Sequence, residues 1–111
     1  MLHQQLTITE PSADETNVGY YGNQWIEFME RCHPKLYKRL EKNQTLYAVA
    51  KSVNDDARNY KLLLDRQYEQ LHAQPQDYEG EEALRKWTFT RNFYTDGTVM
   101  RERVLIPYTK P

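Results

Sequence analysis

The last third of the chain alternates between apolar and polar residues on both sides of the dipeptide Asp96-Gly97. Alternation with a period of two is typical of a β-strand. Asp-Gly readily adopts the two positive φ angles that a type I′ turn requires. The pattern therefore predicts an antiparallel β-hairpin over residues 83–107, with strands at 87–94 and 98–106.

A two-residue loop pairs Thr95 with Thr98, and this pairing sorts the side chains onto two faces of the hairpin. The apolar face pairs Trp87 with Ile106, Phe89 with Val104, Arg91 with Glu102, and Phe93 with Met100. The polar face pairs Thr88 with Leu105, Thr90 with Arg103, Asn92 with Arg101, and Tyr94 with Val99. A shift of one residue would mix the two sets, so the pattern favours this register.

Apolar residues at helical spacing predict three helices within residues 20–73. The first carries a stripe of Tyr21, Trp25, Phe28 and Cys32. Pro34 ends that helix and starts a short second one that reaches Lys42, because proline is tolerated in a first helical turn. The third and longest helix carries a stripe of Leu46, Val49, Val53, Ala57, Tyr60, Leu64, Tyr68 and Leu71. We expect this stripe to cover the other helices and the hairpin; the alternative is self-association through residues 46–71.

These elements predict an α+β fold, in which three helices, the last one long, pack on a C-terminal antiparallel β-hairpin. Residues 6–8 have period-two character and are the candidate for a third strand. We expect one domain over residues 1–111. Its parts are an N-terminal strand and loop at 1–19, a helical segment at 20–73, an acidic linker at 74–82 and the hairpin at 83–107.

Charge is unevenly distributed, although the formal net charge of the 111 residues is only −1. Residues 73–82 carry four acidic and no basic side chains, whereas residues 83–111 carry six basic and two acidic ones. A balanced total gives no global field that would attract nucleic acid or a membrane, so any such contact would have to be local. No apolar run is long enough to span a bilayer and no signal pattern opens the chain, so we expect a cytoplasmic protein with no membrane partner.

No arrangement of residues indicates catalysis, so we do not expect an enzyme. We also expect no cofactor and no metal site. Cys32 and His33 are neighbours, which on a helix point about 100° apart and cannot form a dyad. Cys32 lies on the apolar stripe, so we expect it to be buried and structural. Tyr37 lacks the Arg and His partners of a nucleophilic tyrosine, and we expect it in the core.

Two surfaces are candidates for binding, and for each the plain alternative is a solvated face. The first is the polar face of the hairpin, because a two-stranded ribbon can enter the major groove of DNA. Its candidate contact residues are Thr90, Asn92, Arg101 and Arg103. The second has the density of a phosphate-contacting patch, although Glu30 and Glu41 interrupt it. Its candidate contact residues are Lys35, Lys38, Arg39 and Lys42.

Residues 5–60 resemble the TnpV family, small proteins encoded within bacterial transposons and conjugative elements. The resemblance rests on a short Leu-Thr-apolar segment, an acidic loop, Tyr21-Gly22, Phe28-Met29, Pro34, Leu36-Tyr37, Leu40 and Leu46. The family continues with another helix that begins near a Trp. This chain has Trp87, but the residues after it are β-patterned. The resemblance implies a mobile element of a Gram-positive gut bacterium and carries no mechanism.

We therefore expect a non-enzymatic accessory protein of a bacterial mobile genetic element that acts by binding. DNA is the favoured partner, through the basic hairpin face or the patch at residues 35–42. The alternative is a protein–protein interaction module, such as an inhibitor of a host defence nuclease or a dimeric adaptor.

Overall fold

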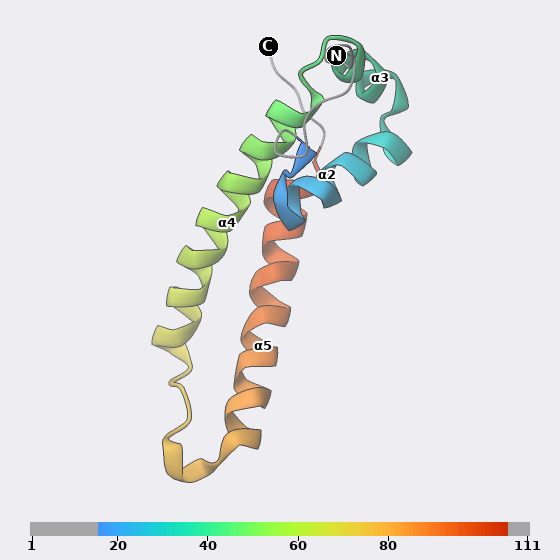
Figure 1. Cartoon of the computed structure of the whole chain (residues 1–111). Helices are drawn as coiled ribbons and strands as arrows, with labels where there is room; N and C mark the ends of the chain where they lie inside the picture. Colours follow the sequence, from blue (N-terminus) through green and yellow to red (C-terminus); the bar gives the residue numbers. More distant parts are fainter. Residues whose placement is uncertain (1–15, 107–111) are drawn as a thin grey trace, which may run out of the picture. The chain divides into compact units, whose positions relative to one another are not determined.

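The computed structural model describes residues 16–106, and in this range the protein is all-helical and contains no strand (Figure 1). The elements are α2 (Gly19–Cys32), α3 (Pro34–Lys42), α4 (Leu46–Leu71), the 3-10 turn η2 (Asp77–Glu79), α5 (Glu81–Val99) and the π-helical turn η3 (Met100–Val104). The chain divides into two compact units, residues 1–54 and residues 55–111, with the boundary inside α4. The single domain expected over residues 1–111 stays a prediction.

The predicted β-hairpin is wrong, and with it the α+β fold class. α5 starts at Glu81 and runs without interruption through Asp96 and Gly97, the dipeptide assigned to the turn. Of the four glycines only Gly19 and Gly80 have a positive φ angle, so Gly97 does not use the freedom that a type I′ turn would need. The third strand proposed at residues 6–8 lies outside the described residues.

Helical spacing is also present in the segment that was assigned to strands. The side chains of Trp87, Arg91 and Thr95 recur every four residues, and all three are at least partly buried. Glu81 and Glu82 occupy the first turn, where carboxylates favour the positive end of the helix dipole. The linker predicted at residues 74–82 ends earlier, because Glu81 and Glu82 begin α5.

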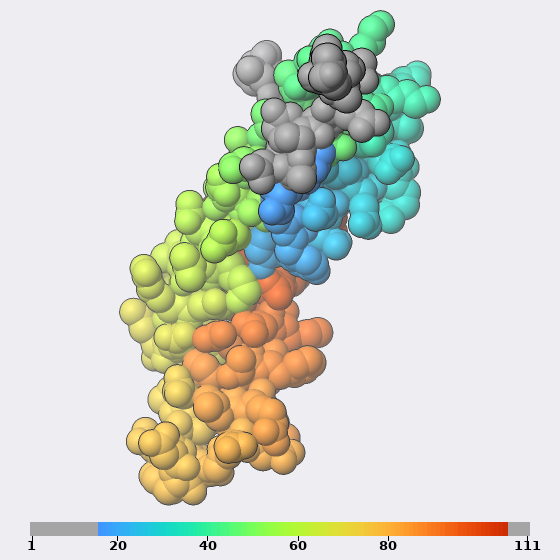
Figure 2. Space-filling view, in the orientation of Figure 1, coloured from blue at the N-terminus to red at the C-terminus, as the bar shows by residue number. Residues whose placement is uncertain are grey.

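Charged groups hold α5 against the second half of α4, and the two segments run side by side in opposite directions (Figures 1 and 2). Arg91 lies between two carboxylates of α4, 3.0 Å from Glu69 and 3.7 Å from Asp65. Lys61 donates to Asp65 at 2.9 Å and to the side-chain oxygen of Asn92 at 3.0 Å. Arg91 and Asn92, which are adjacent, both reach α4 in this way, whereas successive residues of an extended strand would point to opposite faces.

Aromatic side chains also pack between α4 and α5. The Tyr68 ring contacts Trp87 edge-on with the ring centroids 5.9 Å apart, and it stacks with Tyr94 at 6.4 Å. The indole nitrogen of Trp87 donates to the carbonyl oxygen of His72 at 2.9 Å. The long apolar stripe of α4 is thus used within the chain here, although its last residue, Leu71, is exposed.

In the first unit, the side chain of Asn54 on α4 caps the start of α2. Its oxygen accepts hydrogen bonds from the backbone nitrogens of Tyr21, at 3.0 Å, and Gly22, at 3.2 Å. Val18, the residue before α2, provides no side-chain cap. The first N–H groups of a helix have no partner within it, so a buried amide from another helix satisfies them.

Two glycines permit this close approach of α2 to α4. Gly19 has a φ angle of 83°, and a Cβ atom there would lie 2.5 Å from the Asn54 side chain. At Gly22 a Cβ atom would lie 2.8 Å from the carbonyl oxygen of Ala50, a backbone atom that cannot rotate away. The chain therefore requires glycine at both positions.

The helices predicted from proline and from the long apolar stripe are confirmed. α3 begins at Pro34 and ends at Lys42, and α4 spans residues 46–71. The first stripe is correct at Tyr21 and Trp25, which are buried, but Cys32 is exposed. The expectation that Cys32 is buried was wrong because α2 ends there and its last turn is open.

We predict that Gly97→Ala stabilises the protein by about 0.5–1 kcal/mol, since alanine inside a helix avoids the entropy cost of glycine. Among the described residues, a Cβ atom at this position would meet only the Arg101 guanidinium, at 3.5 Å. Urea unfolding followed by circular dichroism measures the change. In a type I′ turn the same substitution would force alanine into a left-handed conformation and lower stability by about 1–2 kcal/mol, so a loss of that size would contradict the helical assignment.

We predict that Asn54→Ala lowers the free energy of unfolding by about 1–3 kcal/mol, because it leaves the N–H groups of Tyr21 and Gly22 without their acceptor. The matched control is Asn59→Ala on the same helix, where the side chain is exposed and the expected change is within about 0.5 kcal/mol. Equal effects of the two substitutions in urea unfolding would show that the Asn54 contact does not stabilise the fold.

Candidate functional site

The basic side chains of α3 lie together on one face of the helix. Lys35, Lys38, Arg39 and Lys42 follow the spacing i, i+3, i+4, i+7, and all four are exposed. At 100° per residue their directions fall within an arc of about 100°. We call these four residues the cationic face of α3. Leu40, which is buried, lies on the opposite side of the helix.

None of the four cations forms an ion pair or side-chain hydrogen bond with any residue in the range 16–106. Glu30 of α2 and Glu41 of α3 are the nearby acidic residues. Burial raises the pKa of the Tyr37 hydroxyl, and the charges of Glu30 and Glu41 raise it further. The raised pKa also disfavours the phenolate that a nucleophilic tyrosine would need.

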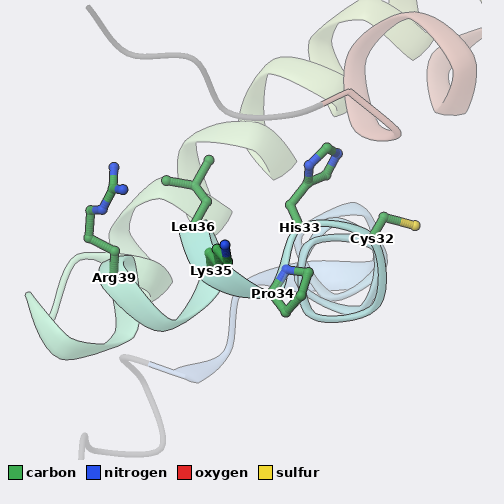
Figure 3. A pocket seen from close by; sticks show the side chains of 6 residues that line it. All are labelled: Cys32, His33, Pro34, Lys35, Leu36 and Arg39. Carbon is green, nitrogen blue, oxygen red and sulfur yellow. The ribbon is translucent and has the colours of Figure 1, made fainter.

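The joint between α2 and α3 forms an open hollow of about 500 Å³ beside the cationic face (Figure 3). Its walls are Cys32, His33, Pro34, Lys35, Leu36 and Arg39. In the close-up, the side chains of His33, Leu36 and Arg39 point to the same side of the ribbon. Two members of the cationic face thus border a concave surface that has an apolar wall.

The hollow depends on the backbone turn at the joint. His33 ends α2 and precedes α3, with a φ angle of −137° and a ψ angle of 60° that belong to neither helix. Its ring contacts Phe28 edge-on with the centroids 5.3 Å apart. Pro34 then fixes the first turn of α3. The direction of the cationic face relative to α2 is therefore set by two adjacent residues.

The polar hairpin face, predicted as the first binding surface, does not exist as a surface. Thr90 and Asn92 lie on α5, where residues two apart point about 200° from each other. The Asn92 oxygen accepts from Lys61 at 3.0 Å and from two nitrogens of Arg91 at 3.2 and 3.3 Å. It holds the helix pair together rather than facing a partner.

The two arginines of that predicted face lie in η3 and differ in their surroundings. Arg103 donates to both oxygens of Asp56 at 2.9 Å, and its guanidinium lies 3.9 Å from the centroid of the Tyr60 ring. The hydrogen bond to Asp56 raises the pKa of Arg103. Arg101 is exposed and donates to the hydroxyl of Thr98, at the end of α5, at 3.4 Å. Contact of these residues with nucleic acid stays a prediction.

Neither a metal centre nor a membrane span is formed by the described residues. Within residues 16–106 no three His, Cys, Asp or Glu side chains gather as metal ligands would. No helix in the described part of the chain has the length and apolar character needed to cross a bilayer.

Comparison with known proteins identifies the family. The family model described as "Transposon-encoded protein TnpV" matches residues 1–102. The match covers most of the chain, so this protein belongs to the TnpV family of transposon-encoded proteins. The resemblance noted over residues 5–60 is confirmed. It extends through α5, the helix that follows α4 and contains Trp87. No curated protein and no solved structure matched the chain.

Proposed function

We propose that this protein acts by binding DNA through the cationic face of α3, as a non-enzymatic accessory protein of its mobile element. The observation that carries the proposal is the cluster of Lys35, Lys38, Arg39 and Lys42 on one exposed helix face. Cations that neutralise phosphates release counterions, and this release drives binding independently of base sequence. The family supports the proposal only through its setting, since its description says that the protein is encoded in a transposon.

The contrast with other basic side chains supports the same reading. Lys61, Arg91 and Arg103 are each paired with carboxylates and hold helices together. Within residues 16–106, no carboxylate pairs with the four cations of α3. A solvated face is the plain alternative, because Arg39 and Lys42 in the last turn also favour the negative end of the helix dipole. A measurement of DNA binding distinguishes a DNA-contacting face from a solvated one.

A protein partner is the second candidate function, as an inhibitor of a host defence nuclease or as an adaptor. The specific observation in its favour is the pair Phe89 and Phe93, whose large aromatic side chains are exposed on α5. Capture from host lysate with and without nuclease treatment separates a protein partner from nucleic acid.

We predict that Lys35→Gln, Lys38→Gln and Lys42→Gln together weaken binding to labelled duplex DNA. The slope of log affinity against log salt should become shallower by about 0.9 for each phosphate that is no longer neutralised, or about 0.7 for single-stranded DNA. Fluorescence anisotropy across a salt series measures both the affinity and the slope.

The matched control replaces Lys51, Arg58 and Arg66 by Gln, because these exposed cations are spread over α4 and the change in net charge is the same. It should leave the slope nearly unchanged. Absence of binding by the natural protein at low ionic strength would end the DNA proposal. An equally weakened control would move the DNA-binding surface away from α3.

We predict that bound DNA slows alkylation of Cys32 by a maleimide. Cys32 is the one cysteine of the chain and is exposed on the wall of the hollow next to Lys35 and Arg39. DNA seated on the cationic face would therefore shield its thiol. Mass spectrometry of timed samples gives the rate. The triple glutamine variant of α3, at the same DNA concentration, should show no protection; an unchanged rate in the natural protein with DNA bound would contradict the placement.

A further inference from the structure

The face of α5 turned away from α4 carries aromatic side chains that no described residue covers. Phe89 is 70% exposed and Phe93 is 67% exposed. Their rings are stacked, with centroids 6.3 Å apart and planes 24° from parallel. The two stacked, exposed rings form a contiguous apolar patch, and such patches on a protein surface are candidates for interaction sites.

α4 cannot cover this pair within the same chain. The side of α5 that α4 occupies is defined by Arg91 and Thr95, which contact Asp65, Glu69 and Lys61. Phe89 and Phe93 precede these residues by two positions each, so they point about 160° away from them around the helix. The helix pair leaves one side of α5 uncovered, and that side is aromatic.

The charges that flank the aromatic pair are arranged symmetrically about residue 91. Lys86 precedes Phe89 by three residues, and Asp96 follows Phe93 by three residues. All four positions fall within an arc of about 80° on the helix surface. Glu82, one turn before Lys86 on the same arc, is paired with Arg85 at 3.6 Å, so Lys86 is the charge next to Phe89 on this strip and Asp96 is the charge next to Phe93.

This strip of α5 is complementary to the same strip on a second copy of the chain when the two α5 helices lie antiparallel. A two-fold axis at residue 91 would place Phe89 of one chain against Phe93 of the other, and Lys86 against Asp96, twice over. A parallel arrangement would instead place Lys86 against Lys86. The pairing does not require Asp96 to lack other contacts, because a carboxylate accepts several hydrogen bonds.

We propose that the outer face of α5 is a self-association surface, on which a second copy of this chain packs antiparallel through Phe89 and Phe93. Stacked and edge-on aromatic contacts across the axis would bury the exposed rings. Lys86 and Asp96 fix the direction of pairing, because opposite charges meet only in the antiparallel arrangement. This surface is distinct in residues from the cationic face of α3 and does not depend on DNA binding.

The first test measures the mass of the full-length protein by sedimentation over a range of concentrations. We expect the natural protein to reach twice the chain mass, and Phe89→Ser with Phe93→Ser to remain at the mass of one chain at the same concentrations. The matched control replaces Leu71 and Tyr78 by Ser, since both are exposed residues with large apolar side chains that lie outside α5. It should dimerise like the natural protein. A natural protein that stays monomeric, or a serine variant that still dimerises, would overturn the proposal.

The second test examines the direction of pairing with Lys86→Asp and Asp96→Lys, each as a separate protein. Alone, each variant brings like charges together at both ends and should dimerise less than the natural protein. Mixed, the two variants restore opposite charges at both ends and should form a heterodimer. Circular dichroism confirms that each variant is folded. Single variants that dimerise as well as the natural protein would overturn the antiparallel arrangement, and a mixture that associates no better than either variant alone would show that residues 86 and 96 do not meet across the interface.

Discussion

The buried side-chain oxygen of Asn54 is the contact on which the first unit depends. One acceptor satisfies two N–H groups at the start of α2, and Gly19 and Gly22 provide the space for it. An unsatisfied N–H buried in this position would be costly, so the amide fixes where α2 begins against α4. Trp25 and Met29, farther along α2, are fully buried. The joint at His33 and the cationic face of α3 follow directly from the end of the helix that Asn54 anchors.

The second unit is held together differently, because polar and aromatic pairs replace most of an apolar core. The side chains of Arg91 and Asp65 are only 21% and 14% exposed, so their attraction is weakened by solvent less than that of a surface pair. Such pairs specify which helix faces meet, since a buried charge without its partner is strongly destabilising. The inner side of α5 also carries Trp87 and Tyr94, which contact Tyr68, whereas Phe89 and Phe93 lie on the outer side. Phe89 and Phe93 therefore occupy the side of α5 on which an amphipathic helix usually carries polar residues.

Sequence predicted the helices whose signal is local. Pro34 marked the start of α3, and a long single stripe marked α4, because both signals depend on neighbours along one helix. The prediction for the segment after Gly80 was wrong because the apolar residues there fit both a period of two, typical of a strand, and a period near four, typical of a helix. Asp96-Gly97 then favoured the hairpin, whereas the carboxylates that select the helix are distant in sequence: Glu69 lies 22 residues from its partner Arg91. The available signals for a helix were the acidic residues at 81 and 82, the spacing of Trp87, Arg91 and Thr95, and the additional helix implied by the family resemblance.

The candidate binding residues also differ in this respect: some are grouped by spacing along one helix, and others depend on contacts with residues distant in sequence. The spacing of Lys35, Lys38, Arg39 and Lys42 could be read directly, since one helix carries them all. Thr90, Asn92, Arg101 and Arg103 were grouped by a strand register that does not form, and three-dimensional contacts then separated them: Arg103 is held by Asp56, while Arg101 is exposed. A basic residue is available for an outside anion only when no carboxylate of its own chain is within reach. That condition depends on tertiary pairing, and the cationic face of α3 meets it among the described residues, whereas Arg103 does not.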